Sequence, residues 1–216
     1  MNFSVIEPYT PMFARGLAVT LEVTGAALVL AFTLGFLIAV LKALPCRPLR
    51  VVLDFYTSIF RGIPLIVLLF IAYFATPQLT GYKITMFAAS VLTLGLNGSA
   101  TVSETVRGGI EGVDRGQYDA ARALGLPYHL MMWEIIIPQA LLSVTPALVN
   151  EVITVLKSSS LVATIGLMDM MRAAQSVQAL TYRAFEPFIA VAAVYYVIVM
   201  ALVAVSRHLE RRLRQN

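Results

Sequence analysis

Long stretches of apolar residues are the feature that most limits what this chain can fold into. Residues 84–103 and 187–206 carry no charged side chain, and residues 17–41 carry only Glu22. Each stretch is about as long as a helix that crosses the hydrocarbon core of a bilayer, roughly 20 residues. The chain is 59% hydrophobic and 13% charged, whereas a soluble domain has about 25% charged residues. The sequence therefore predicts an all-α membrane protein.

Two further stretches, interrupted by prolines and a few polar residues, complete a set of five predicted transmembrane helices. The five spans cover residues 17–41, 55–75, 84–103, 135–156 and 187–206. The second contains Arg61 and Pro64, and the fourth contains Pro138 and Pro146. Because 216 residues leave little room for a soluble domain beside five spans, residues 1–216 are expected to form a single transmembrane domain.

The basic residues predict the orientation of these spans, because cytoplasmic loops of membrane proteins are enriched in Lys and Arg. An odd number of spans puts the two termini on opposite sides. With the C-terminus inside, the cytoplasmic segments hold Lys42, Arg47, Arg50, Arg61, Arg107, Arg115, Arg122, Arg207, Arg211, Arg212 and Arg214. The outside then holds the other five of the 16 basic residues, Arg15, Lys83, Lys157, Arg172 and Arg183. We therefore expect the N-terminus outside and the C-terminus in the cytoplasm.

The loop over residues 107–134 is the longest segment predicted to be cytoplasmic, and it contains a short polar helix at about 114–125. Asp114 or Asp119 can cap or begin this helix, and the alanine-rich segment 120–124 favours helix. Gly125 is placed to end it, and Pro127 prevents its continuation. The composition alone leaves two interpretations open, a simple connector or a surface for another protein.

The segment from Gly116 to Gly125, followed by Ile137-Pro138-Gln139-Ala140, resembles the EAA motif of permease subunits of ABC importers. Asp119 stands where that motif has glutamate, which keeps the charge and shortens its reach. The resemblance implies the type I ABC importer permease fold with a cytoplasmic coupling helix that docks on the ATP-binding subunit. It assigns the contact to Gly116, Gln117, Asp119, Ala120, Ala121, Arg122 and Gly125.

Four more segments are similar to motifs of the permeases that import polar amino acids. They are Arg61–Leu65 with Phe70, Glu104–Ile110, Asn150-Glu151 with Lys157–Leu161 and Ile165-Gly166, and Tyr182–Glu186. The resemblance implies a permease subunit that moves polar amino acids across the cytoplasmic (inner) membrane of a bacterium. It also implies three kinds of protein partner: a dimer of ABC ATP-binding subunits, an extracytoplasmic solute-binding protein and a second permease copy, identical or similar.

The chain lacks the G-x-x-x-x-G-K-[ST] loop that holds nucleotide phosphates. We therefore expect no cofactor on this chain, ATP and magnesium on the partner subunit, and no enzymatic activity of its own. The single cysteine, Cys46, excludes an intrachain disulfide, and neither histidine has metal-ligand spacing. The basic residues follow the loops rather than one face, which argues against nucleic-acid binding.

Polar residues inside predicted spans are costly and often functional. We place the substrate pathway along Asn97, Glu104, Asn150, Glu151, Lys157 and Ser159. For Glu151, binding of the substrate ammonium group competes with a structural pairing to Lys or Arg. Glu104 has Arg107 three residues later and is expected to pair with it, and Lys157 is as well explained by an ammonium group that reaches the membrane surface.

Two other classes of function remain open at this point. An ion-coupled secondary transporter would be expected to show internal repeats with broken helices, and the sequence shows none that is convincing. A non-transporting membrane scaffold would explain the spans but neither the intramembrane glutamates nor the cytoplasmic helix.

Overall fold

The computed structural model describes residues 3–44 and 46–213, and the side chains within this range up to residue 208. Arg214, one of the basic residues assigned to the cytoplasmic side, lies outside the described residues, as do the side chains of Arg211 and Arg212. The described chain is helical with short connections. Four of its helical stretches are long and apolar enough to cross a membrane, and a bent pair of helices makes a fifth if it is counted as one span.

The N-terminal third of the chain contains the first span and the bent pair. Two short 3-10 turns, Phe3–Val5 and Glu7–Tyr9, lead into α1 (Thr10–Ala43). After α1 come α2 (Arg47–Gly62), α3 (Leu65–Phe70), the π-helical turn η3 (Ile71–Ala75) and α4 (Thr76–Thr80).

The remaining elements begin with α5 (Met86–Glu111), α6 (Arg115–Ala123), α7 (Tyr128–Leu130) and the π-helical turn η4 (Met131–Ile136). They end with α8 (Ile137–Ser158), the 3-10 turn η5 (Ser159–Ile165), α9 (Met170–Thr181) and α10 (Phe185–Leu213). The expected spans at 17–41, 84–103, 135–156 and 187–206 are therefore confirmed as long apolar helices.

The expected span at 55–75 is wrong as a single helix, because the chain bends by 103° between α2 and α3. Ile63 is extended, with φ −98° and ψ 134°, immediately before Pro64. The proline ring disfavours helical backbone at the residue before it, so the helix ends there and a new one begins. The expected helix at about 114–125 is present as α6.

The core of the molecule is the contact between α1 and α5, which cross at close range. A side chain at Gly95 would begin 2.6 Å from a Leu30 carbon, and one at Gly35 would begin 2.7 Å from Val102. Small residues let membrane helices approach this closely. Inside a bilayer the hydrophobic effect does not drive helices together, so close van der Waals packing stabilises their contact instead. α8 packs on the same helix α5, and α9 packs on the N-terminal part of α1.

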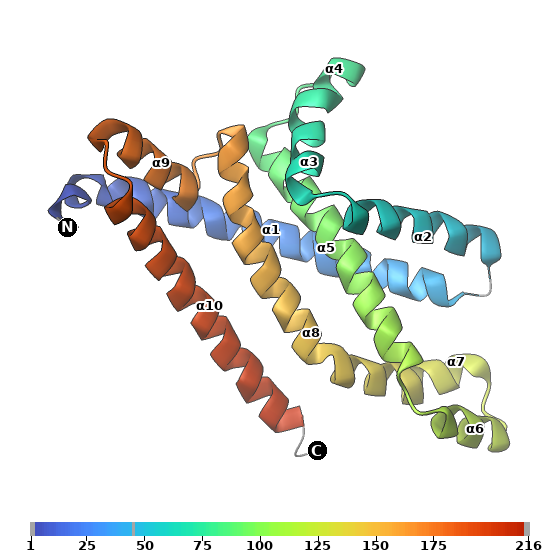
Figure 1. Ribbon diagram of the computed structural model, residues 1–216. Helices are drawn as coiled ribbons and strands as arrows, with labels where there is room; N and C mark the ends of the chain where they lie inside the picture. Colours follow the sequence, from blue (N-terminus) through green and yellow to red (C-terminus); the bar gives the residue numbers. More distant parts are fainter. Residues whose placement is uncertain (1–2, 45, 214–216) are drawn as a thin grey trace.

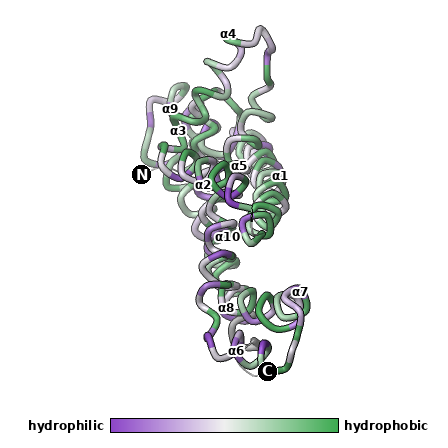
Figure 2. The backbone as a smooth tube through the Cα atoms, turned by 90° about the vertical axis from the view of Figure 1, so that its right-hand side faces the viewer, coloured by the Kyte–Doolittle hydropathy of each residue, from purple (hydrophilic) through white to green (hydrophobic). Residues whose placement is uncertain are grey.

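Figure 1 shows that α5, α8 and α10 run side by side, with α6 and α7 at one end of them and α9 with the N-terminus at the other. The C-terminal end of α10 lies toward the α6 end. Figure 2 shows that the loop carrying α6 lies at one end of the molecule and contains several hydrophilic residues, drawn in purple.

Candidate functional site

The helix α6 has a defined beginning and a defined end. At its start, the Asp114 carboxylate accepts a hydrogen bond from the Gly116 backbone N–H at 2.7 Å, so Asp114 rather than Asp119 is the cap. At its end, the Gly125 N–H donates to the Arg122 carbonyl and the Leu126 N–H donates to the Ala121 carbonyl. Gly125 has φ +70°, the left-handed conformation that this kind of helix end requires. The expected role of Gly125 as a terminating residue is confirmed.

One face of α6 is attached to the start of the fourth span. Ala121 is buried against Met131, Met132 and Ile136 of η4. The Tyr118 hydroxyl donates to the carbonyl of Ile110, near the end of α5. The helix is therefore held between the end of α5 and the start of α8, and a displacement of α6 must move one or both of these helices.

The other face of α6 is exposed. Of the residues expected to contact another protein, Gly116, Gln117, Asp119, Ala120, Arg122 and Gly125 lie on the surface, whereas Ala121 is only 2% exposed. The sequence reasoning missed Leu124, whose side chain is 78% exposed. A single exposed apolar residue is common on protein surfaces, so it is the position of Leu124 directly after α6, beside the exposed Arg122 and Gly125, that makes it a candidate contact residue.

A cluster of charged side chains joins α1, α2 and α5 at the same end of the molecule. The Lys42 ammonium group lies 2.7 Å from a Glu104 oxygen and 2.8 Å from an Asp54 oxygen. It also donates to the Thr57 hydroxyl. The Lys42 side chain is 1% exposed, so these partners offset the cost of burying its charge.

Glu104 lies at the centre of this cluster, and it also lines a cavity of about 480 Å³ with Asp54 and Arg61. Its second carboxylate oxygen is 2.6 Å from Arg107, which also pairs with Glu111, and 3.8 Å from Arg61. The expected pairing of Glu104 with Arg107 is confirmed. The contact with Lys42, 62 residues away in the sequence, was not predicted.

Glu151 is buried in the middle of α8, and it faces α5 and α1. A Cβ atom at Gly98 would lie 3.6 Å from a Glu151 carboxylate oxygen and 2.9 Å from Ala31. Within residues 3–44 and 46–208, no side chain forms an ion pair or hydrogen bond with this carboxylate. The pairing with Lys or Arg that would make Glu151 purely structural is therefore not found in the described part of the chain.

The other expected pathway residues are spread over different faces. The Asn97 amide donates to the Phe60 carbonyl, so it faces α2 rather than Glu151. Asn150 is exposed, and Lys157 is exposed beside a cavity of about 250 Å³ that Tyr195 also lines. Ser159 is fully buried and donates to the Leu156 carbonyl. The structure brings none of these four together with Glu104, and Glu151 is the member that combines burial with a carboxylate free of ion pairs in the described chain.

Comparison with known proteins identifies the family of the chain. Residues 31–215 match the family described as the binding-protein-dependent transport system inner membrane component. The chain belongs to this family. In this permease, α6 lies on the loop between α5 and α8, at one end of these long apolar helices.

Relatives of this permease are similar over almost their whole length. The arginine transport system permease protein ArtQ of Bacillus subtilis is 43% identical over 216 residues, which is 100% of this chain and 99% of ArtQ. The L-cystine transport system permease protein TcyL of the same organism is 33% identical over 221 residues, covering 100% of this chain and 92% of TcyL.

Solved structures agree with this assignment. A crystal structure of an amino acid ABC transporter with histidines has a chain 40% identical to this permease, with a TM-score of 0.94 over 98% of this chain and 99% of that chain. A chain of the MetNI methionine ABC transporter in an inward-facing conformation is 21% identical, with a TM-score of 0.80 over 96% of this chain, and shares its fold.

Proposed function

We propose that this permease is the transmembrane subunit of an ATP-driven importer of polar amino acids. The observation that carries the proposal is α6, an exposed polar helix fixed between α5 and α8. Movement of α6 by an ATP-binding subunit would be transmitted directly to the two helices that meet at Glu151. Relatives named for arginine and L-cystine transport support the substrate class.

The proposed assembly contains two permease copies, two ATP-binding subunits and an extracytoplasmic solute-binding protein. α10 has exposed apolar side chains, among them Ile189, Tyr196 and Val197. A second permease copy or the lipid of the bilayer is proposed to cover this face. We propose the N-terminus outside and the C-terminus in the cytoplasm. The joint position of α6 and the C-terminal end of α10 supports this orientation, as does the distribution of basic residues.

The pathway is proposed to open and close where α5 and α8 meet. With the ATP-binding subunits apart, the route is open to the cytoplasm; their closure on ATP pulls the α6 helices together and opens the outer side. Glu151 is proposed to receive the ammonium group of the passing amino acid. A carboxylate in a water-poor site binds an ammonium group strongly, because a charge-assisted hydrogen bond there has little competition from water.

The exposed end of α6 provides the test of this proposal. Leu124→Asp places a charge where an apolar side chain is proposed to be buried against the ATP-binding subunit, so the affinity between the two subunits should fall at least about tenfold. The matched control is Leu79→Asp, at a residue 88% exposed in α4 far from α6. Co-purification of the permease with the ATP-binding subunit measures the effect. Equal association in Leu124→Asp and the control would contradict the docking role of α6.

A further inference from the structure

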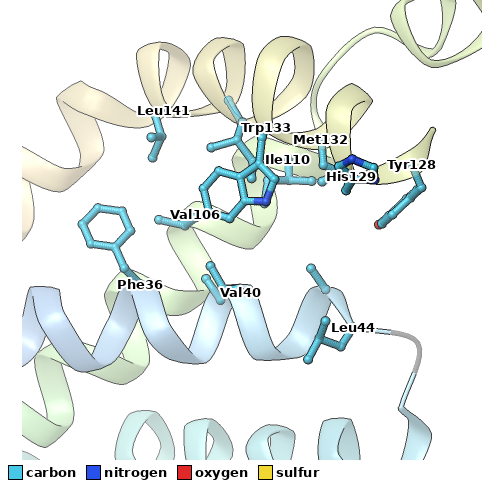
Figure 3. Close-up of a pocket in the computed structure, with 14 residues that line it drawn as sticks. Phe36, Val40, Leu44, Val106, Ile110, Tyr128, His129, Met132, Trp133 and Leu141 are labelled. Carbon is cyan, nitrogen blue, oxygen red and sulfur yellow. The ribbon is translucent and has the colours of Figure 1, made fainter. Parts of the chain in front are cut away.

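An apolar groove of about 510 Å³ lies between the second half of α1 and the segment that begins the fourth span. Phe36, Val40 and Leu44 form one wall, and Trp133 and Leu141 face them from the other (Figure 3). Its size is typical of cavities that hold small molecules, about 300–1,000 Å³. The groove is distinct from the proposed pathway, since neither Asn97, Glu104 nor Glu151 lines it.

The lining of the groove excludes a polar amino acid as its occupant. Three of the side chains that line it carry a hydrogen-bonding group: Tyr128 and His129 at one end, and the indole of Trp133. The others are hydrocarbon or thioether side chains. A charged amino acid would lose its hydration there and gain few partners. A hydrocarbon chain has no such cost.

A second cavity, of about 290 Å³, continues from the polar end of the groove. The two share Ala39, Ala43, Leu44, Ile110, Tyr128 and Met132. The second cavity adds three basic side chains, Lys42, Arg50 and Arg107, and one acidic side chain, Glu111. The site is thus apolar along one part and lined by charged side chains at the other.

Arg50 is the cation in this second cavity that is available to a ligand. Lys42 and Arg107 are each held by two carboxylates at 2.6–2.8 Å. Arg50 is 53% exposed, and its ion pair with Asp54 is long, at 3.9 Å. A phosphate group near Arg50 would therefore meet a cation that is not already neutralised at close range.

We propose that these joined cavities bind one anionic phospholipid, with an acyl chain in the groove and its phosphate beside Arg50. The division of the site matches the two parts of such a lipid, and basic pockets between membrane helices are suited to anionic headgroups. Tyr128 and Trp133, both 58% exposed, line the groove. Tyrosine and tryptophan favour the boundary between membrane and water, where the headgroup of such a lipid lies. On the orientation proposed above, this lipid lies in the cytoplasmic leaflet; its binding does not depend on that orientation.

Trp133 allows a direct test, because it is the single tryptophan of the chain and it lines the groove. The full chain is reconstituted in phosphatidylcholine bilayers, and a small fraction of the lipid is replaced by phosphatidylglycerol with dibrominated acyl chains. Bromine quenches tryptophan on contact. We expect the apparent affinity for brominated phosphatidylglycerol to exceed that for brominated phosphatidylcholine about fivefold, the effect of about one nearby cationic residue.

Two pairs of variants locate the lipid. Arg50→Gln should reduce the preference to about one, and Arg50→Lys should keep it. Val40→Phe should reduce it by filling the groove, whereas Val29→Phe, on an exposed part of α1 outside the groove, should not. Equal affinities in the unmodified chain, or an Arg50→Gln preference that is unchanged, would overturn the proposal. So would quenching that falls as the protein density rises, since a second copy of the chain would then cover the groove. The quenching experiment measures lipid binding and not transport. A negative result would therefore overturn the lipid site without bearing on the proposed function.

Discussion

At the scale of single residues, the carboxyl group of Glu151 is the feature most closely tied to the proposed transport pathway. It is 9% exposed, and it faces the small residues of α5 and α1 with no ionic partner in the described chain. A buried carboxylate without such a partner is costly. The bound ammonium group of a substrate would offset this cost during transport.

Glu151→Gln tests this role, because it keeps the size and polarity of the side chain and removes its charge. A hydrogen bond to a charged group contributes about 1.5–3 kcal/mol, so the apparent affinity for substrate in reconstituted uptake should fall by roughly tenfold or more. Glu22→Gln, the same change at an exposed position of α1, is the control. Unchanged uptake kinetics in Glu151→Gln would return Glu151 to a structural role.

Asp169, in the connection between η5 and α9, makes the stability of the fold depend on pH. It is completely buried and accepts a hydrogen bond from the Arg172 N–H with one oxygen. The other oxygen has no hydrogen-bond partner among the described residues. Burial raises the pKa of Asp169 from 3.8 to about 6. Between these values the folded chain keeps a proton that the unfolded chain has lost, so stability falls as the pH rises through this window and stays lower above it.

Asp169→Asn should remove this dependence, because asparagine keeps the helix-capping acceptor and carries no charge. The variant should match the unmodified chain near pH 4 and be more stable at pH 7.5, by on the order of 2–3 kcal/mol. Thermal unfolding of the purified chain in detergent, measured from pH 4 to pH 8, gives the comparison. Parallel curves for the two proteins would show that Asp169 does not titrate in this range.

At the scale of elements, α6 depends on how its last turn is closed. Gly125 has φ +70°, a conformation that costs residues with a Cβ about 1–2 kcal/mol and is worse for β-branched ones. A Cβ there would meet no other atom within 4 Å, so a substitution acts through the backbone alone.

Gly125→Val should therefore distort the end of α6 while the membrane spans still insert and fold. ATP hydrolysis by the assembled transporter should continue, and uptake per ATP should fall several-fold because α6 no longer transmits the movement. Gly125→Asn, which tolerates the left-handed conformation, should retain most of the coupling. A valine variant with normal uptake per ATP would show that the shape of this helix end is not needed.

The elements differ in how far the sequence could predict them. The spans in α1, α5 and α10 follow from long apolar stretches, and α6 follows from its cap, its alanines and Gly125. The bend between α2 and α3 was missed, because a proline in a membrane helix permits many angles and packing selects the 103° found here. The charged cluster was also missed. Lys42 reads as a loop lysine next to a span end, and only the crossing of α1 and α5 places it against Glu104.

At the scale of the whole molecule, the proposal requires α6 and the end of α10 to lie on the cytoplasmic side, where an ATP-binding subunit can reach Ala120 and Leu124. The arrangement of the helices puts α9 and the start of α1 at the opposite end, which is where the proposal requires the solute-binding protein to dock. In the opposite orientation this mechanism could not operate, whichever amino acid is carried.

Accessibility of α6 to a membrane-impermeant thiol reagent tests this most directly. The chain has a single cysteine, so Cys46→Ser gives a background in which Ala120→Cys carries the only thiol, at an exposed position of α6. The account predicts labelling in inside-out vesicles and protection in sealed right-side-out vesicles. Labelling of Ala120→Cys from the outside of intact cells would contradict it.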